Sequence, residues 1–321
     1  MILLFGQNID PHVQKIKELL DEVDIEYCIF DYQNRYESDS ITYCINDGKF
    51  DLSFSTENKD KIIHNNDIHS VWWRMKPPLI QPKETVETLR YEDLRNREWF
   101  HVLRPLYENT NAKWINKLDS QYTASHKIYQ LGNAVKMGFS IPNTIISNDF
   151  DEIEDFIRKH DSHSEVIYKP LTYFWEPPGK ITTTTVVSLD LLNKISSSVK
   201  VTPGIYQTRI QKKYELRITI VGEMVFAIRI DTLGIPEAEL DWRTHTFNVK
   251  YSKFEIPNAL KTSLLKLHKS FDLFYGAYDF IVTEDDNWIF LEVNPGGQWL
   301  WLEEETGMPI SKALAESLII K

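Results

Sequence analysis

Three side chains in the C-terminal part of the chain carry oxygen atoms that could bind a divalent cation: Asp279, Glu292 and Asn294. The first lies in residues 275–283, and the other two lie in residues 288–294. Both segments alternate between apolar and polar side chains, which is typical of β-strands, and a short polar stretch separates them. The pattern therefore predicts a β-hairpin that carries all three side chains.

The expected register of this hairpin brings the three side chains together. If Thr283 pairs with Trp288, then Asp279 lies directly opposite Glu292, where like charges repel. Asn294 is two residues away from Glu292 and therefore shares its face. Mg²⁺ prefers oxygen ligands and is usually held by one or two carboxylates together with substrate phosphates. The hairpin therefore predicts a metal–nucleotide site.

Cationic side chains elsewhere in the chain are candidates for binding phosphate groups: Lys127, Lys169, Arg217 and Arg229. Lys169 ends a predicted strand and precedes a proline, so it could hold a phosphate as a point charge or simply be solvated. Arg217 and Arg229 lie within apolar strands, where an arginine is almost never buried without a partner. They could serve in catalysis, or they could form structural ion pairs with Glu215 or Asp231.

Two loops add further candidates. Asp241, Trp242 and Arg243 place a carboxylate, an indole and a guanidinium side by side, which suggests either substrate contact or a surface turn. Residues 294–297, Asn-Pro-Gly-Gly, follow the second strand of the hairpin, and their glycines permit close approach of the backbone to phosphate. We expect the tryptophans after this loop, Trp299 and Trp301, to pack in the protein and not to stack on a nucleotide base.

The composition restricts the classes of function. The 321 residues are 42% hydrophobic and 26% charged, which is typical of a globular protein with two or three domains. The net charge of −11 argues against nucleic-acid binding, because there is no basic surplus to displace phosphate counterions. No window approaches the roughly 18 apolar residues of a membrane span. Cys28 and Cys44 form neither a disulfide framework nor a zinc pattern, so we expect a cytoplasmic protein.

The order of the predicted elements is that of an α/β protein. A buried strand at residues 1–5, a helix opened by Asp10 and Pro11, and a strand at residues 25–30 form a Rossmann-like β-α-β unit. The unit lacks the G-x-G-x-x-G signature, so it is not assigned a dinucleotide. A helix is expected at residues 119–137. The expected domains are, in chain order, residues 1–115, 116–187 and 188–321.

Several motifs together resemble those of the ATP-grasp ligases. They are Q-x-R-I at residues 207–210, E-L-R-I-T-I-V-G at 215–222, Y-D-F-I-V at 278–282 and F-L-E-V-N-P-G-G-Q-W-L-W at 290–301. Within this family the chain most resembles the peptide maturases that make graspetides, the microviridin-type macrocyclases. S-V-W-W-R at residues 70–74, D-W-R at 241–243 and the end of the last motif are similar to that branch. The resemblance covers nearly the whole chain and implies an ATP-grasp fold behind a Rossmann-like N-terminal domain.

The resemblance also implies ATP and Mg²⁺ as cofactors and a role for most of the candidate residues. Asp279, Glu292 and Asn294 would hold one or two Mg²⁺ ions. The residues implied in nucleotide binding are Lys127 and Lys169 at the phosphates, Gln207, Arg209 and Ile210 in a hinge strand whose backbone reads adenine, and Glu215 at the ribose. Those implied in catalysis are Arg217, Arg229 and Arg243.

The partner that the resemblance implies is a precursor peptide with a leader. No nucleic acid and no membrane are expected as partners, and a homodimer is possible. Residues 180–185, with four consecutive threonines, would form a lid over the phosphates. The candidate contacts with the peptide are Arg74, Tyr173, Asp241 and Trp242.

The implied reaction activates Asp or Glu side chains of the precursor peptide as acyl-phosphates. These would then react with Thr or Ser hydroxyls to give esters, or with Lys amines to give amides. One alternative is an ATP-grasp ligase of the same fold that joins free amino acids or adds residues to the end of a peptide or protein. The other is a nucleotide-binding scaffold that has lost catalysis.

Overall fold

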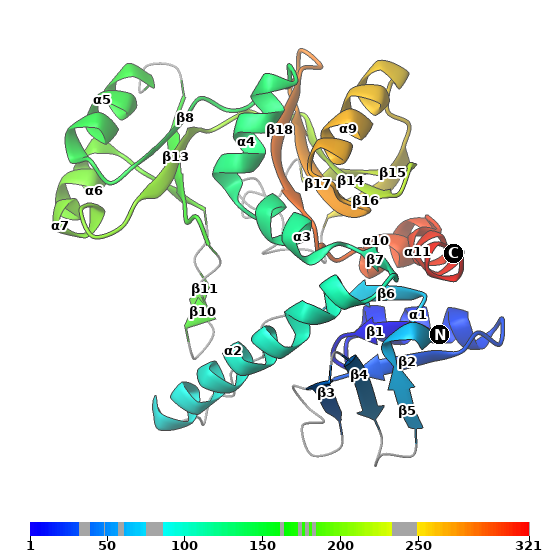
Figure 1. The fold of residues 1–321 in the computed structure, drawn as a ribbon. Coiled ribbons are helices and arrows are strands. Elements are labelled where there is room, and N and C mark those ends of the chain that lie inside the picture. Colours follow the sequence, from blue (N-terminus) through cyan, green and yellow to red (C-terminus); the bar gives the residue numbers. More distant parts are fainter. Residues whose placement is uncertain are drawn as a thin grey trace.

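The computed structural model describes residues 1–31, 39–47, 49–56, 61–74, 86–160, 164–172, 175–176, 180–181, 184–232 and 249–320. These residues form three α/β units, each built on its own main sheet (Figure 1). The mixed architecture confirms the predicted fold class. In the described part of the chain, no helix is both long and apolar enough to cross a membrane.

The N-terminal unit is built on a four-stranded parallel sheet with the order β2-β1-β6-β7. Its strands are β1 (Ile2–Phe5), β2 (Tyr27–Phe30), β6 (Ser70–Trp73) and β7 (Lys113–Ile115). Helix α1 (Pro11–Asp21) connects β1 to β2, and the Asp10 side chain caps it by accepting a hydrogen bond from the backbone N–H of His12 at 2.8 Å. This parallel β-α-β unit is the predicted Rossmann-like start.

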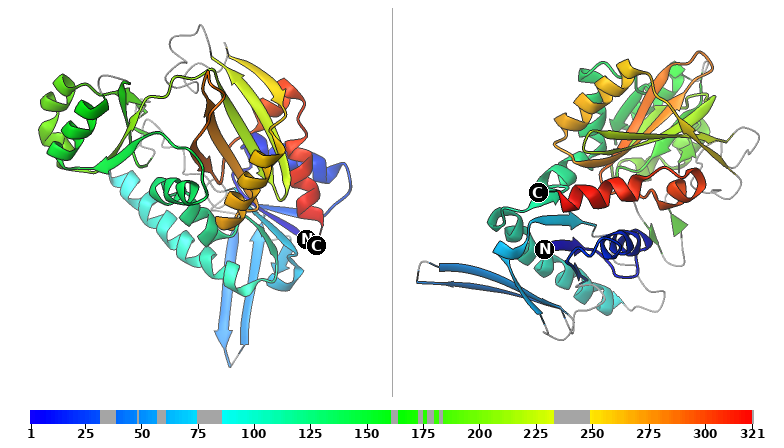
Figure 2. Two further views of the ribbon diagram at one scale, coloured as in Figure 1. Left: turned by 90° about the horizontal axis from the view of Figure 1, so that it is seen from above. Right: turned by 90° about the vertical axis from the view of Figure 1, so that its right-hand side faces the viewer.

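A second sheet and a long helix complete the N-terminal unit. Strands β3 (Ser40–Asn46), β4 (Lys49–Thr56) and β5 (Lys61–His64) form an antiparallel sheet that extends outward (Figure 2), and the 3₁₀ turn η1 (Asn65–Asp67) follows it. Helix α2 (Val86–Asn109) spans the unit. Phe54 and Ile63 pack with Leu103 and Leu106 of α2 in one apolar cluster. This cluster holds the extended sheet against the parallel one.

The central unit is built on an antiparallel sheet with the order β12-β9-β13-β8. Its strands are β8 (Thr144–Ser147), β9 (Val166–Lys169), β12 (Thr185–Val186) and β13 (Gly204–Thr208). Helices α5 (Phe150–His160), α6 (Leu189–Lys194) and α7 (Ser196–Val199) pack on one face of the sheet. A small hairpin of β10 (Trp175–Glu176) and β11 (Lys180–Ile181) stands apart from it (Figure 1).

The sheet topology moves the expected boundary between the second and third domains. Strand β13 pairs with both β8 and β9, so the chain stays within the central unit until Thr208. Helices α6 and α7 pack on the same sheet. The central unit therefore ends after residue 208 and not at residue 187, because strand pairing over a long sequence distance is not visible in a local pattern.

Two helices replace the single helix expected at residues 119–137. Helix α3 (Leu118–Ala124) and helix α4 (Lys127–Lys136) are separated at Ser125 and His126, where His126 has an extended backbone with φ −81° and ψ 112°. The hydroxyl of Ser125 donates to the backbone carbonyl of Tyr122 at 2.6 Å, and such local bonds compete with helix propagation. The break therefore places Lys127 in the first turn of a new helix.

The C-terminal unit is built on a five-stranded antiparallel sheet with the order β16-β15-β14-β17-β18. Its strands are β14 (Tyr214–Val221), β15 (Met224–Asp231), β16 (Lys250–Phe254), β17 (Tyr275–Val282) and β18 (Trp288–Asn294). Helices α3, α4 and α9 (Asn258–Ser270) pack on one face. Helices α10 (Leu300–Thr306) and α11 (Ile310–Ile319) pack on the other.

Helix α11 joins the C-terminal sheet to the N-terminal unit. Its Leu314 and Leu318 belong to one apolar cluster with residues of β14 and β15 on one side and of β1 and α1 on the other. The hydroxyl of Ser70 donates to the carbonyl of Leu318 at 2.7 Å, and the amine of Lys113 donates to the carbonyl of Ser317 at 2.8 Å. The first and last units of the chain therefore share a continuous core.

Candidate active site

The carboxylate hairpin forms, and Asp279 of β17 lies opposite Glu292 of β18 as predicted. The register near the turn differs by one residue from the expectation, because Val282 and not Thr283 pairs with Trp288. A β-bulge next to Asp279 shifts the register back. Such a bulge sets two residues of one strand against one residue of the other. The two carboxylates therefore meet despite the different turn.

Arg217 of β14 lies on the side of Asp279 opposite to Glu292. Its Nη1 donates hydrogen bonds to both carboxylate oxygens of Asp279, at 2.7 and 2.6 Å. Arg217 is only 6% exposed. Burial lowers the pKa of Arg217, but the charge and hydrogen bonds of Asp279, together with Tyr275 and Glu292, outweigh burial and raise it. The sheet therefore keeps a permanent positive charge beside the two carboxylates.

Lys127 lies on the other side of the carboxylates. Its Nζ is 3.3 Å from Oε2 of Glu292. Helix α4 is fixed there by Gln130, whose Nε2 donates to the carbonyl of Val293 at 2.8 Å and whose Oε1 accepts from the N–H of Val293 at 3.1 Å. Gln130 therefore binds the edge of β18 as another strand would. This contact brings the first turn of α4 next to Glu292.

Asn294 ends β18, and the loop after it packs against Arg217. Asn294 pairs with Ala277, which puts its side chain on the same face as the carboxylates. Its Oδ1 accepts from the N–H of Gly296 at 3.0 Å. A Cβ atom at Gly297 would lie 2.6 Å from Cβ of Ala277 and 2.8 Å from Nη2 of Arg217. Only glycine fits at position 297 without a shift of its neighbours.

The donors of this site fit a hard divalent cation. Asp279, Glu292 and Asn294 present two carboxylates and one amide oxygen on one face of two adjacent strands. Glu292 is partly open to solvent, with 27% of its side chain exposed. Among the described residues, no group of three or more His, Cys, Asp or Glu forms a metal cluster. In proteins, Mg²⁺ is usually held by one or two carboxylates together with substrate phosphates, and these donors fit that pattern.

Two of the predicted nucleotide contacts lie on the central sheet. Lys169 ends β9 and pairs with Ile205, and its side chain is half-buried. Gln207 is buried in β13, where its Nε2 donates to the hydroxyl of Thr144 at 3.0 Å. The side chain of Gln207 therefore stabilises the sheet, and Lys169 offers its cation at the end of a strand.

The remaining predicted nucleotide contacts lie on or near residues 209–213, the linker between the central and C-terminal sheets. The Arg209 backbone N–H donates to the carbonyl of Glu165 at 2.7 Å, and its guanidinium forms an ion pair with the same residue. Ile210 follows and is half-buried. Glu215 forms an ion pair with Lys212 at 2.5 Å, with side chains only 10% and 8% exposed. Lys212 is thus a cation of this region that the sequence pattern does not single out.

The structure separates Arg229 from the carboxylates. Because Ile228 is the residue that pairs with Arg217, the side chain of Arg229 points to the opposite face of the sheet. There its guanidinium makes hydrogen bonds of 2.5 to 3.0 Å with Asp231 and lies 4.1 Å from the ring centroid of Tyr214. The ion pair with Asp231, the structural alternative considered for this arginine, is the arrangement that forms.

Arg74, a candidate contact with the peptide, lies in the interior. It is 4% exposed. Its Nε donates to Oδ2 of Asp10 at 3.2 Å, and its Nη1 donates to the carbonyl of Gly296 at 2.9 Å. The guanidinium also lies 5.3 Å from the ring centroid of Trp299. Arg74 therefore contacts the loop after Asn294, and its expected contact with the peptide stays a prediction.

Four predicted site residues lie outside the described residues: Tyr173, Asp241, Trp242 and Arg243. Residues 182–183 of the expected lid do so as well. The roles of these residues in catalysis and in peptide binding stay predictions.

Asn116 also builds the site, although the sequence pattern does not point to it. Its Nδ2 donates to the carbonyls of Tyr275 and Pro295, each at 2.9 Å, and its Oδ1 accepts from the N–H groups of Phe274 and Tyr275, each at 2.7 Å. It fixes the start of β17 to the loop after β18. In the sequence, Asn116 can be noticed as a polar residue directly after a buried strand. Gln130 can be noticed in a similar way, as a polar residue on the buried face of α4.

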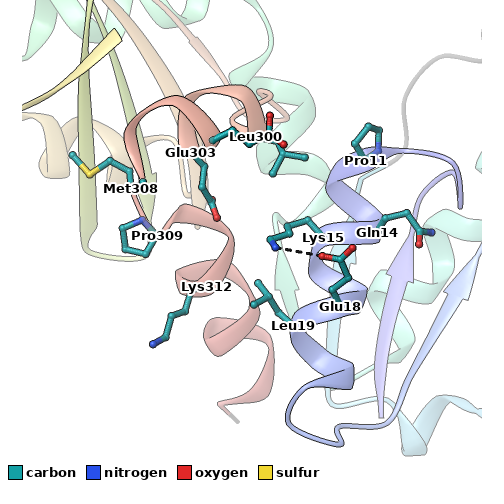
Figure 3. Close-up of a pocket in the computed structure, with 12 residues that line it drawn as sticks. Pro11, Gln14, Lys15, Glu18, Leu19, Leu300, Glu303, Met308, Pro309 and Lys312 are labelled. Carbon is teal, nitrogen blue, oxygen red and sulfur yellow. Dashed lines mark hydrogen bonds and ion pairs between the residues drawn. The ribbon is translucent and has the colours of Figure 1, made fainter.

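A cavity of about 660 Å³ lies away from this site, between α1 and the loop that joins α10 to α11 (Figure 3). Charged residues of both signs line it, among them Lys15, Glu18, Glu303 and Lys312, and an ion pair joins Lys15 to Glu18. No predicted site residue lines this cavity. It is therefore separate from the site that the carboxylates define.

Solved structures match this chain over nearly its whole length, whereas no protein-family model and no curated protein matches it. A RiPP-associated ATP-grasp ligase from Chryseobacterium gregarium, solved with ADP and a leader and core peptide, is 29% identical with a TM-score of 0.86, covering 99% of this chain and 96% of that chain. Macrocyclase MdnC from Microcystis aeruginosa MRC, bound with precursor peptide MdnA, is 27% identical with a TM-score of 0.84, covering 99% of both chains. Macrocyclase MdnB from the same organism is 23% identical, with a TM-score of 0.80 and coverage of 100% and 99%, and supports the fold.

The fold, its carboxylate site and these similarities define an ATP-grasp ligase. The chain is similar to RiPP-associated ATP-grasp ligases and macrocyclases, which confirms the resemblance to the graspetide maturases.

Proposed function

We propose that the chain uses ATP and Mg²⁺ to cross-link a ribosomally made precursor peptide that carries a leader. Asp or Glu side chains of the peptide become acyl-phosphates and are then joined to Thr or Ser hydroxyls or to Lys amines. The proposal draws support from the ADP and peptides bound to the similar ligases. We place the reaction in the cytoplasm, where ATP is supplied.

The observation that carries the proposal is a row of four charged side chains across three strands and one helix, in which two carboxylates lie between two cations. Arg217, Asp279, Glu292 and Lys127 follow one another on β14, β17, β18 and α4. The two cations hold the carboxylates in place and can attract polyphosphate. Such a row suits the binding of a metal–phosphate complex better than a purely structural role. Glu292 is partly exposed, so water can stabilise its charge and the fold does not require a buried partner for it.

The bound nucleotide would be held by residues from two sheets. Asp279, Glu292 and Asn294 would hold Mg²⁺, which when bound would neutralise phosphate charge. Lys127 and Lys169 would bind phosphate oxygens as point charges. Residues 207–210 and Glu215 would contact the nucleoside, since they lie on and beside the connection between the sheets.

In the first step, a carboxylate oxygen of the peptide attacks the γ-phosphorus of ATP. The bond to the bridging oxygen breaks, ADP leaves, and an acyl-phosphate forms. Charge spreads over the phosphoryl oxygens in the transition state. Arg217 is suited to stabilise it, because a fixed, buried guanidinium needs no reorganisation when the charge develops.

In the second step, a hydroxyl or amine of the same peptide attacks the acyl carbon. The carbon–oxygen bond to phosphate breaks, an ester or amide forms, and the departing phosphate or solvent accepts the proton of the nucleophile. Water must be kept away meanwhile, because it would hydrolyse the acyl-phosphate. No covalent intermediate with the enzyme is required.

The test is incubation with ATP, Mg²⁺ and a leader-bearing peptide whose core contains Thr and Asp or Glu. We expect release of phosphate that depends on the peptide, together with loss of one water per bond in the mass spectrum of the peptide. A peptide encoded next to the gene for this chain is the first substrate to try. Turnover with free amino acids and none with such peptides would contradict the proposal, as would ATP binding without any turnover.

A further inference from the structure

We infer that Arg74 is a positioning residue for this reaction, acting on the metal site through the loop of residues 294–297. The inference rests on the proposed function of that site. Arg74 belongs to the N-terminal unit, which contributes no residue to the row of charges. Its contacts nevertheless lead to that row by a short path through backbone atoms.

The first contacts on this path join Arg74 to two consecutive carbonyls of the loop. Its Nη1 donates to the carbonyl of Gly296 at 2.9 Å and to that of Gly297 at 3.3 Å. The hydroxyl of Tyr275 donates to the same carbonyl of Gly297 at 2.9 Å. Burial raises the pKa of Tyr275 to about 12, so this donor keeps its proton at neutral pH. The Gly297 peptide group is thus fixed by two buried donors.

The next contact joins Gly297 to the catalytic arginine. The position where a Cβ would stand at Gly297 is 2.8 Å from Nη2 of Arg217. Arg217 in turn donates to both oxygens of Asp279. The same loop begins at Asn294, a predicted Mg²⁺ ligand. A shift of the loop would therefore move the guanidinium and the amide ligand together.

Asp10 and His12 hold Arg74 and the start of α10, which follows this loop. Oδ2 of Asp10 accepts from Nε of Arg74 at 3.2 Å, and Oδ1 of Asp10 lies 2.9 Å from Nδ1 of His12. Nε2 of His12 accepts from the backbone N–H groups of Trp299 and Leu300, at 3.2 and 3.3 Å. Burial opposes ionisation of Asp10, but the hydrogen bonds from His12 and the charge of Arg74 outweigh it and hold the pKa of this carboxyl well below its usual range.

The geometry requires an arginine and not merely a positive charge. The two donors of Arg74 point in different directions: Nε binds Asp10, and Nη1 binds the two carbonyls of the loop. The planar guanidinium also lies near two tryptophan rings, 5.9 Å from the centroid of Trp72 and 5.3 Å from that of Trp299. A lysine amine is a single point and cannot reproduce this planar fork. Arg74→Lys therefore keeps the charge but should release the loop.

The experiment compares Arg74→Lys with two control variants, Ser70→Ala and Lys113→Ala. Each control removes a hydrogen bond between the N-terminal unit and α11 without touching the loop of residues 294–297. The readouts are the melting temperature, kcat and KM with the leader-bearing peptide, and the affinity for ADP with and without Mg²⁺. The binding measurement needs no turnover, so it tests the inference even if the proposed reaction fails.

For Arg74→Lys we expect kcat to fall about tenfold to a hundredfold, because small misplacements of catalytic groups have effects of this size, with KM for the peptide nearly unchanged. The increase in ADP affinity that Mg²⁺ produces should also shrink. The controls should lower the melting temperature but keep the effect of Mg²⁺ and kcat near wild type. The inference is overturned if Arg74→Lys matches the controls in the Mg²⁺ effect, or if its losses simply follow the melting temperature.

Discussion

Arg217 and Asp279 form a buried ion pair in which one guanidinium nitrogen, Nη1, donates to both carboxylate oxygens at 2.7 and 2.6 Å. The pair forms one end of a cross-strand row, with Glu292 opposite Asp279 on the next strand. Two adjacent carboxylates are thus stabilised by a cation that is part of the sheet itself. Mg²⁺ and nucleotide would meet a site that is already ordered.

The two arginines of the β14–β15 hairpin should differ sharply in their effect on turnover. Arg217→Lys keeps a charge in the sheet but loses the fixed guanidinium, and we expect kcat to fall by about 10²- to 10³-fold, as for loss of a fixed transition-state donor. Arg229→Lys should leave kcat near wild type, because Arg229 is on the opposite face and its partly exposed ion pair contributes less than about 1 kcal/mol. Initial rates of ADP release would measure both. Equal losses would contradict the assignment of faces.

Glu292→Gln should abolish turnover while the fold is kept. The substitution is nearly isosteric, but it removes one of two carboxylates that the Mg²⁺ site requires and the charge that holds Lys127 at 3.3 Å. We expect an unchanged circular dichroism spectrum and loss of the Mg²⁺-dependent part of ADP affinity. The control is Glu316→Gln, an exposed residue of α11, which should behave as wild type. Activity near wild type in Glu292→Gln would show that the metal assignment is wrong.

Gly297→Ala should destabilise the protein and impair the site at once. The added methyl group would stand 2.6 Å from Cβ of Ala277 and 2.8 Å from Nη2 of Arg217, so the loop or the arginine must move. Overpacking of this kind typically costs about 1–3 kcal/mol. Gly132→Ala is the matched control, because no atom lies within 4 Å of the new methyl group in helix α4 and alanine favours the helix. Urea unfolding should show opposite signs for the two variants, and equal signs would contradict the packing described.

We predict that the protein loses stability in mild acid, because His268 is buried. Burial lowers the pKa of His268 to about 4, from an ordinary value of 6.5. The unfolded chain therefore binds this proton at a higher pH than the folded chain, and the free energy of unfolding decreases as the pH falls from about 6.5 to about 4. The shift corresponds to a loss on the order of 3 kcal/mol.

The measurement for His268 is urea unfolding between pH 4 and pH 7, compared with His268→Gln. Other groups titrate in this range in both proteins, so the difference between the two curves isolates the histidine. We expect the variant to be less stable at pH 7 and to lose less stability on acidification. In the structure, Nδ1 of His268 lies 2.8 Å from the hydroxyl of Tyr278. If the stability curves of the two proteins ran parallel, His268 would not be buried there as a neutral group.

The parts of the site that follow from local pattern could be predicted from the sequence. Strand alternation places Asp279, Glu292 and Asn294 on one face, and that prediction is confirmed even though the turn pairs one residue earlier. The face of Arg229 could not be predicted, because a shift of one residue in the β14–β15 register moves a side chain to the other face. Its alternative, an ion pair with Asp231, is the one observed.

The parts that depend on distant segments could not be predicted. Arg74 directly follows β6, and only the packing of the first unit against the last buries it under the loop after Asn294. Asn116 and Gln130 bind backbone groups of β17 and β18 that are more than 150 residues away. Hydrogen bonds to backbone groups need no particular partner residue, so the sequence does not show which distant groups these two side chains bind.

The most direct test of the central claim uses a leader-bearing peptide whose Asp and Glu side-chain carboxylates carry ¹⁸O. If the chain activates these carboxylates as acyl-phosphates, one labelled oxygen passes from the peptide to phosphate for each bond formed. We predict that the phosphate released with ATP and Mg²⁺ carries one ¹⁸O atom per ester or amide, measured by mass spectrometry. Cross-linked peptide accompanied by unlabelled phosphate would contradict the account, because the carboxylate oxygen would then not have attacked phosphorus.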